Sequence, residues 1–185
     1  KHAEVAERWV LLNFTSSKRR QLMRDLAKRI ERARHRVWIT NPYFVPPMRL
    51  VRALCVAARK GVDVRLIVPR RNDVFLVRWL SGHYYSALLD AGVHIYEFLP
   101  CTLHAKTLIV DNRCTVGSSN FNHRSFFHDL EVDVVLEMER SVEALTQLFK
   151  QDMKLSEKIP LEKWGRRSWR LRAAEKLLFG FRHWL

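Results

Sequence analysis

The sequence predicts an α/β fold in which helices flank a mixed, mostly parallel central sheet. Strand patterns and helical patterns alternate through most of residues 16–159, and parallel strands need such alternation because a crossover, usually a helix, must carry the chain back between them. Two helical patterns end on a glycine, Gly61 and Gly92, and a β-branched run follows each glycine at once. These junctions indicate a repeated unit of strand, helix and strand.

The first half of the chain supplies the repeated unit. An amphipathic helix with a basic outer face is predicted over 16–36, with Ser16 or Ser17 as its N-cap. The β-branched and aromatic run at 37–44 predicts a strand, and the Pro-Pro pair at 46–47 stops it because proline cannot continue a central strand. The elements that follow are a helix over 48–61, a strand over 62–69, a helix over 73–92 and a strand over 93–98.

The second half predicts a hairpin and two closing elements. Residues 103–111 and 115–116 have strand patterns, and a turn at 111–113 is predicted to join them. An alternating strand pattern over 131–138 and an amphipathic helix over 141–159 complete the predicted domain.

The composition of the chain changes at Pro160. We therefore predict two parts, a core domain over 1–159 and a basic tail over 160–185 that holds three of the six tryptophans. Interleaved Trp, Leu, Phe and Arg is typical of a segment that lies in a membrane interface. A C-terminal helix that packs on the domain is the alternative.

The net charge is strongly positive. The 185 residues hold 33 Lys+Arg against 19 Asp+Glu, a formal net charge of +14, and 48% of them are apolar. This apolar content and length suffice for a buried core, which excludes a disordered basic tail. The charge predicts a polyanionic partner, either nucleic acid or the head groups of an anionic membrane.

Cysteine usage and hydropathy bear on location. Cys55, Cys101 and Cys114 are widely spaced and form no zinc-ligand pattern, which favours a reducing compartment. The sequence holds no run of about 20 apolar residues that could cross a bilayer, so membrane contact of this segment is predicted to be peripheral. The chain begins with Lys1 rather than methionine, and we expect it to be a fragment of a longer protein.

A cluster of chemically capable residues lies between positions 104 and 120. His104 and Lys106 stand two residues apart, so on a strand their side chains would share one face. Asp111 follows after the apolar residues TLIV, and GSSN occupies 117–120. The cluster supplies an imidazole, an ammonium, a hydroxyl, an amide and a glycine that permits close backbone approach, which together suit a phosphoryl group.

Each side chain has an expected role in cleaving a phosphodiester. Lys106 would neutralise a non-bridging oxygen, while Ser118 and Asn120 would donate hydrogen bonds that orient the phosphate. Neutral His104 can attack phosphorus, and protonated His104 can give its proton to the leaving alkoxide. Glu131 is our candidate for the acceptor that fixes the His104 tautomer, although a salt bridge would also explain it. We expect no cofactor and no metal.

The motif resembles the signature of the phospholipase D superfamily, HxKxxxxD followed by GSxN, here HAKTLIVD at 104–111 and GSSN at 117–120. The family usually has six residues between the aspartate and the glycine, and this chain has five, which we interpret as a shorter hairpin turn. The resemblance implies that Asp111 is mainly structural and that Glu131 orients His104. Arg124 and Ser125 match the arginine-serine pair that follows GSxN in the family.

The resemblance is closer to one branch, the C-terminal half of the bacterial cardiolipin synthases. It extends over NPYFVPP (41–47), ARKGVDVRLIVP (58–69) and YYSALLDAGVHIYEF (84–98). It implies ping-pong phosphatidyl transfer with phosphatidylglycerol as donor and acceptor, through a phosphohistidine. In two-lobe relatives the first-lobe histidine is commonly the nucleophile, so the resemblance favours His104 as the acid/base partner, and the sequence leaves the nucleophile role open. The second lobe would be either a missing N-terminal half or a second copy. Tyr43 and Phe44 either line a lipid entrance or belong to the core.

Three function classes remain open from the sequence. The first is a cardiolipin synthase-like phosphatidyltransferase with an anionic phospholipid substrate, peripheral on the cytoplasmic face of the bacterial inner membrane. The second is a phosphodiesterase of the same superfamily that cleaves nucleic acid, which the charge of +14 would also suit. PYFVPP and the tryptophan-rich tail disfavour nucleic acid as the partner. The third is a non-enzymatic basic module, which the complete HxK and GSxN set disfavours.

Overall fold

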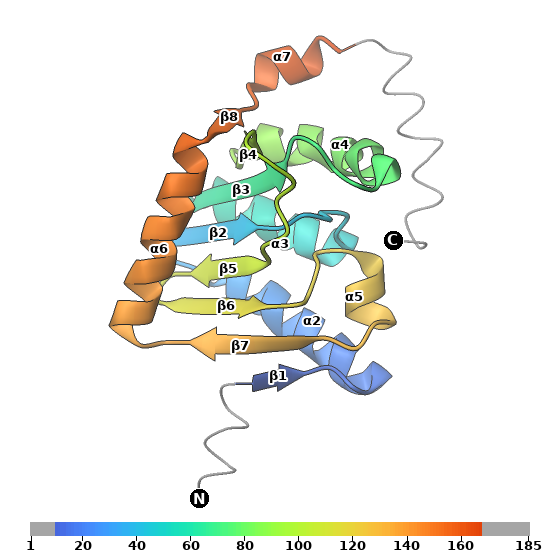
Figure 1. Cartoon of the computed structure of the whole chain (residues 1–185), viewed down its shortest axis with the longest axis vertical. Helices are drawn as coiled ribbons and strands as arrows, with labels where there is room; N and C mark the ends of the chain where they lie inside the picture. The colour runs from blue at the N-terminus through green and yellow to red at the C-terminus, as the bar shows by residue number, and fades with distance from the viewer. Residues whose placement is uncertain (1–9, 168–185) are drawn as a thin grey trace, which may run out of the picture.

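An eight-stranded sheet forms the centre of the computed structural model, which describes residues 10–167 apart from the side chains at 75, 76 and 78 (Figure 1). In spatial order, the strands are β1 (Val10–Leu12), β7 (Val132–Leu136), β6 (Arg113–Gly117), β5 (Thr107–Val110), β2 (Arg36–Thr40), β3 (Asp63–Pro69), β4 (His94–Phe98) and β8 (Ser156–Lys158). The helices are α2 (Ser16–Glu31), α3 (Met48–Arg59), α4 (Phe75–Asp90), α5 (His123–Phe127), α6 (Glu139–Lys154) and α7 (Leu161–Gly165).

The sheet is mixed and flanked by helices, as predicted, but its parallel part is small. Only β2, β3 and β4 pair in parallel, joined by the crossover helices α3 and α4. The five other pairings in the described part of the chain are antiparallel. The expectation of a mostly parallel sheet is corrected here, because β5 runs antiparallel to β2, β6 and β7 follow it as antiparallel neighbours, and the edge strands β1 and β8 also pair antiparallel.

Several boundaries differ from the predicted ones. Helix α2 ends at Glu31 rather than 36, and its N-cap is Thr15, whose hydroxyl accepts a hydrogen bond from the Lys18 N–H at 3.1 Å. Helix α6 ends at Lys154, and residues 156–158 pair with β4 as an edge strand instead of continuing the helix to 159. Sheet pairing therefore overrides the helical periodicity at this end of the domain.

Two cores lie on the two faces of the sheet. Helices α2, α3 and α4 cover one face and α6 crosses the other (Figure 1). Successive residues of β2 alternate between the cores, with Val37 and Ile39 on the first face and Trp38 on the second. The Trp38 ring stacks on Phe149 of α6, with the ring centroids 4.9 Å apart. The period of two in the sequence thus corresponds to two buried faces.

The first part of the predicted tail packs on the core domain. Trp164 of α7 is partly buried, and its ring lies 5.0 Å from that of Tyr85 in α4, centroid to centroid. The guanidinium of Arg167 sits over the Trp164 ring at 3.2 Å. Helix α7 thus packs on the domain through Trp164, while the division of the chain at Pro160 stays a prediction. Residues 168–185 lie outside the described residues, and the membrane-interface segment stays a prediction for them.

The alternation of strand directions brings the predicted site residues other than Asp111 to one end of the sheet. Parallel β2 ends there at Thr40, β5 begins there at Thr107, β6 ends at Gly117 and β7 begins at Val132. The segments 41–45, 104–106, 117–120 and residue 131 consequently follow or precede these ends. Gly117 is required at this end because a Cβ there would lie 2.6 Å from Asp133 Cα and would also clash with the Val132 carbonyl oxygen.

We expect Gly117→Ala to lower the free energy of unfolding by about 1–3 kcal/mol, since the added methyl group meets backbone atoms that cannot move aside cheaply. Denaturant unfolding followed by circular dichroism measures the change. Gly165→Ala is the matched control, because no atom lies within 4 Å of the Cβ built there. Equal stability of the two variants would contradict the close approach of β6 and β7.

Candidate active site

His104 and Lys106 lie in a segment without regular secondary structure directly before β5. The predicted strand over 103–111 is shorter in the structure and begins only at Thr107. The His104 side chain is exposed and Lys106 is half-buried. The Lys106 ammonium donates a hydrogen bond to the His104 carbonyl oxygen at 2.8 Å. This bond bends the lysine back over the segment that carries the histidine.

The GSSN segment connects β6 to the next loop and is tied down by carboxylates. The Ser118 hydroxyl donates to Glu131 and accepts from the Val132 N–H at 3.0 Å. The Ser119 hydroxyl donates to the Asp133 carboxylate at 2.5 Å. Asn120 Oδ1 is shielded from solvent and has no hydrogen-bond partner within residues 10–167. The predicted phosphate-binding residues Ser118 and Asn120 are therefore brought together in one loop beside Glu131.

Glu131 is held by two serine hydroxyls. Ser118 Oγ donates to one carboxylate oxygen and Ser125 Oγ donates to the other at 2.5 Å. Neither oxygen of Glu131 hydrogen-bonds the His104 ring among the interactions of residues 10–167. That Glu131 orients His104 stays a prediction. In the structure, Glu131 anchors Ser118 and Ser125.

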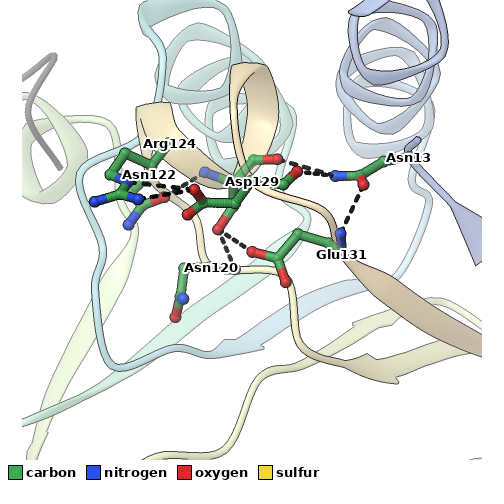
Figure 2. A network of polar contacts seen from close by, with 7 residues as sticks. Asn13, Asn120, Asn122, Arg124, Asp129 and Glu131 are labelled. Carbon is green, nitrogen blue, oxygen red and sulfur yellow. Dashed lines mark hydrogen bonds and ion pairs between the residues drawn. The ribbon is translucent and has the colours of Figure 1, made fainter. Parts of the chain in front are cut away.

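Asn13 fixes the same region from the far end of the sequence. It is 7% exposed, and its Oδ1 accepts the Glu131 N–H at 2.6 Å. Its Nδ2 donates to the carbonyl oxygens of Ser125 and Asp129 at 3.2 and 3.1 Å (Figure 2). No motif contains Asn13, and no local pattern in the sequence indicates it. The network fixes the start of β7 to the end of β1.

Helix α5 completes this network. Asn122 is its N-cap, and its Oδ1 accepts the Ser125 N–H at 2.9 Å. The exposed Arg124 pairs with Asp129, with 3.0 Å between Nη2 and Oδ1, and Figure 2 shows the two side chains in contact. Of the arginine-serine pair, only the serine contacts Glu131.

Asp111 lies away from this cluster. It occupies the β5–β6 turn with φ of 52°, five residues from Lys106 along an extended strand, which is roughly 15 Å. Its carboxylate accepts the backbone N–H groups of Arg34, His35 and Arg36 at 3.0, 2.8 and 3.1 Å. Burial acts to raise the pKa of Asp111, but these three N–H groups hold it below its ordinary value. The position fits a structural role in joining the start of β2 to the turn.

Two residues beside His104 were not predicted to act on it: the sequence left Tyr43 between a lipid entrance and the core, and it did not indicate Asp73. Tyr43 Oη donates to both carboxylate oxygens of Asp73 at 2.8 and 2.7 Å, and the Tyr43 ring stands edge-on to the His104 ring with centroids 6.1 Å apart. Burial, and then the hydrogen bond to Asp73, raise the pKa of Tyr43 to about 12. Its neighbour Phe44 is fully buried and therefore belongs to the core rather than to a lipid entrance. Asp73 lies in a loop without any motif.

Lys106 is the cation of the cluster. Burial lowers its pKa from the ordinary value, and the carboxylates of Glu131 and Asp73 act in the opposite direction. Both acids therefore lie within electrostatic reach of the ammonium. A bound phosphodiester would add a third anionic group next to Lys106, which is the arrangement that an ammonium point charge can neutralise.

A cavity of about 270 Å³ lies beneath the cluster, between α2, α5 and the sheet. Its apolar walls are Leu22, Leu26, Leu108, Phe121 and Phe126, and its polar lining includes Lys106, Ser119, Glu131 and Asp133. Within residues 10–167, no group of three His, Cys, Asp or Glu side chains is placed to hold a metal ion.

The fold and the cluster together define an α/β domain of the phospholipase D type. A phospholipase D family member, Nuc from Salmonella typhimurium, has the same fold, with a TM-score of 0.68, 21% identity and coverage of 82% of this chain and 96% of that chain. A phosphatidylserine synthase from Haemophilus influenzae Rd KW20 has a TM-score of 0.73 and 15% identity, with 95% and 47% of the two chains covered. At these identities, the likeness concerns the fold.

The sequence relatives narrow the class to one family. The chain belongs to the family described as "Cardiolipin synthase, PLD-like domain", whose model matches residues 26–153. It is 40% identical to a cardiolipin synthase of Halalkalibacterium halodurans over 147 residues, and this match covers 79% of this chain and 29% of the relative. It is 38% identical over 150 residues to cardiolipin synthase A of Yersinia pseudotuberculosis, covering 80% and 31%. The predicted resemblance is confirmed, and the chain spans about three tenths of the length of these relatives.

We expect Asp111→Asn to lower the free energy of unfolding at neutral pH by about 1–3 kcal/mol, because three backbone N–H groups lose a charged acceptor. Since folding lowers the pKa of Asp111, its contribution is present above the unfolded value near 4 and is lost as pH falls below it. The difference between wild type and variant should therefore shrink in acid, as measured by denaturant unfolding at several pH values. Asp90→Asn, an exposed position at the end of α4, should show no such difference.

Proposed function

We propose that the chain is the second catalytic lobe of a phosphatidyltransferase that joins two phosphatidylglycerol molecules into cardiolipin and releases glycerol. One observation carries the proposal: the HxK and GSxN residues lie together at one end of the sheet. They do so in a chain that is 40% identical to a cardiolipin synthase over 79% of this chain's residues. Lys106, Ser118 and Asn120 would hold the phosphate oxygens. This charge neutralisation would make the phosphorus open to attack.

His104 would act first as general acid and then as general base. In the first step, a histidine of the other lobe attacks the phosphorus and forms a P–N bond. The P–O bond to glycerol breaks, its electron pair stays on the glycerol oxygen, and that oxygen takes the proton from protonated His104. In the second step, a hydroxyl of another phosphatidylglycerol gives its proton to His104 and attacks phosphorus, and the P–N electron pair returns to the first histidine.

A second lobe is part of the proposal. An apolar surface adjoins Glu131 on strands β1 and β7, where Leu12 and Val132 pair directly and are each 45% exposed. Phe14 and Leu130 beside them are 67% and 75% exposed. Exposed apolar area of this kind next to half a site is typical of an interface. We propose that the other catalytic lobe, from the same protein or a second copy, covers it.

We further propose that the protein works at the cytoplasmic face of a bacterial inner membrane. The outer face of α2 is strongly basic and would attract anionic lipid head groups. Among residues 10–167, none of the helices has the length and apolarity that a bilayer crossing needs. The contribution of this segment to membrane binding would then come from its basic surface and from residues 168–185.

We expect His104→Ala in the full-length protein to reduce cardiolipin formation at least about 100-fold, because the departing glycerol loses its proton donor. Mass spectrometry of the lipids formed from phosphatidylglycerol measures the product. His35→Ala is the matched control, since its exposed side chain lies at the opposite end of β2. Undiminished product in the His104 variant would refute the catalytic assignment. A wild-type protein that cleaves single-stranded DNA but forms no cardiolipin would favour the nuclease alternative.

We expect deletion of residues 168–185 to weaken binding to vesicles that contain phosphatidylglycerol by at least about tenfold, since each basic residue near an anionic surface contributes about 1 kcal/mol. Co-sedimentation measures binding, and phosphatidylcholine vesicles provide the neutral comparison. The deletion spares α7 and its contact with Tyr85. Binding that stays the same would contradict the proposed interfacial role of the tail.

A further inference from the structure

Two loops meet beside His104 at the carboxyl ends of the parallel strands β2 and β3. The first loop follows β2 and carries Tyr43, and the second follows β3 and carries Asp73. Asn72 Nδ2 donates to the Pro42 carbonyl oxygen at 2.7 Å, which ties the loops together a second time. Functional groups often collect at the carboxyl ends of parallel strands, but neither Tyr43 nor Asp73 belongs to the HxK or GSxN motif.

The Asp73 carboxylate is exposed, and three hydrogen bonds fix its direction. Tyr43 Oη donates to both of its oxygens at 2.8 and 2.7 Å, and the Val74 N–H donates to Oδ1 at 3.1 Å. The hydrogen bond from Tyr43 lowers the pKa of Asp73, burial opposes this shift, and the charge of His104 adds to it. Asp73 is therefore an ionised group within electrostatic reach of His104. It retains lone pairs that Tyr43 and Val74 do not occupy.

Glu131 differs from Asp73 in this respect. Both of its oxygens accept serine hydroxyls, from Ser118 and Ser125. These bonds hold the GSSN loop and α5, and breaking either one would take the carboxylate acceptor away from a serine hydroxyl. Asp73 likewise makes no hydrogen bond to the His104 ring among residues 10–167, but its exposed carboxylate can accept one without losing Tyr43.

We propose that Asp73, held by Tyr43, is the positioning residue that orients His104 and stabilises its protonated form while the leaving alcohol takes the proton. The proposal rests on the acid/base role given to His104 under the proposed function. When the P–O bond breaks and its electron pair remains on the alkoxide, the imidazolium proton moves to that oxygen and His104 becomes neutral. Asp73 keeps its charge throughout and exchanges no proton. The Tyr43 ring, edge-on to the imidazole at 6.1 Å, limits the rotation of His104 on one side.

The test compares two leaving groups in the full-length protein. Glycerol leaves phosphatidylglycerol as a basic alkoxide that needs a proton, whereas 4-nitrophenol leaves phosphatidyl-4-nitrophenol without one. For Asp73→Asn, we expect the first-turnover rate of glycerol release to fall about 10- to 100-fold and the first-turnover rate of 4-nitrophenol release to change less than about threefold. Tyr43→Phe should show a smaller loss with the same selectivity, and Asp73→Glu should recover part of the glycerol release.

A matched control and the other acid complete the design. Asp90→Asn should leave both rates unchanged, because this exposed residue ends α4 away from the site. Glu131→Gln should reduce both rates together, because it loosens the phosphate-binding loop. Equal loss with both leaving groups in Asp73→Asn would overturn the proposal. A wild type that releases glycerol and 4-nitrophenol but forms no cardiolipin would refute the proposed transfer, while the leaving-group comparison would still decide the role of Asp73.

Discussion

The antiparallel pairing of β5 on β2 is the constraint on which the site depends. Strands β2, β3 and β4 run in one direction, and a fourth parallel strand would carry Lys106 to the opposite end of the sheet. The reversal at β5 places the start of this strand beside the end of β2, and the hairpins that follow return to the same end twice. Four loops thus meet there, and Asp111 secures the reversal at the other end through three backbone N–H groups.

The charges are divided between the site and the surface. The chain carries a net charge of +14, yet the cluster itself has one lysine among several carboxylates. Glu131 and Asp133 are each engaged by serine hydroxyls, which spreads their charge over hydrogen bonds. A phosphate can then approach Lys106 without meeting an uncompensated acid at the GSSN loop. The excess positive charge lies elsewhere, for example on α2, where it can act on a whole anionic surface.

The sequence predicted the parts that local patterns encode. Periodicity located the helices and strands from α2 to β4, and consecutive motif residues located His104, Lys106, Ser118 and Asn120. Strands β1 and β8 have three residues each, too few for a period, and pairing with a distant partner alone makes them strands. The contact between Asn13 and Glu131 spans 118 residues, and the contact between Tyr43 and Asp73 joins two loops. Such partners follow from topology and leave no local signal.

Asn13 gives the edge strand β1 a significance beyond its length. A short strand held by a single neighbour is where a sheet opens at the lowest free energy. Because Asn13 accepts the Glu131 N–H and also binds the α5 loop, opening of β1 would free the Glu131 backbone and that loop together. A partner that packs against β1 would therefore also restrain the GSSN loop at 117–120, because the strand and the loop are connected through Asn13 and Glu131.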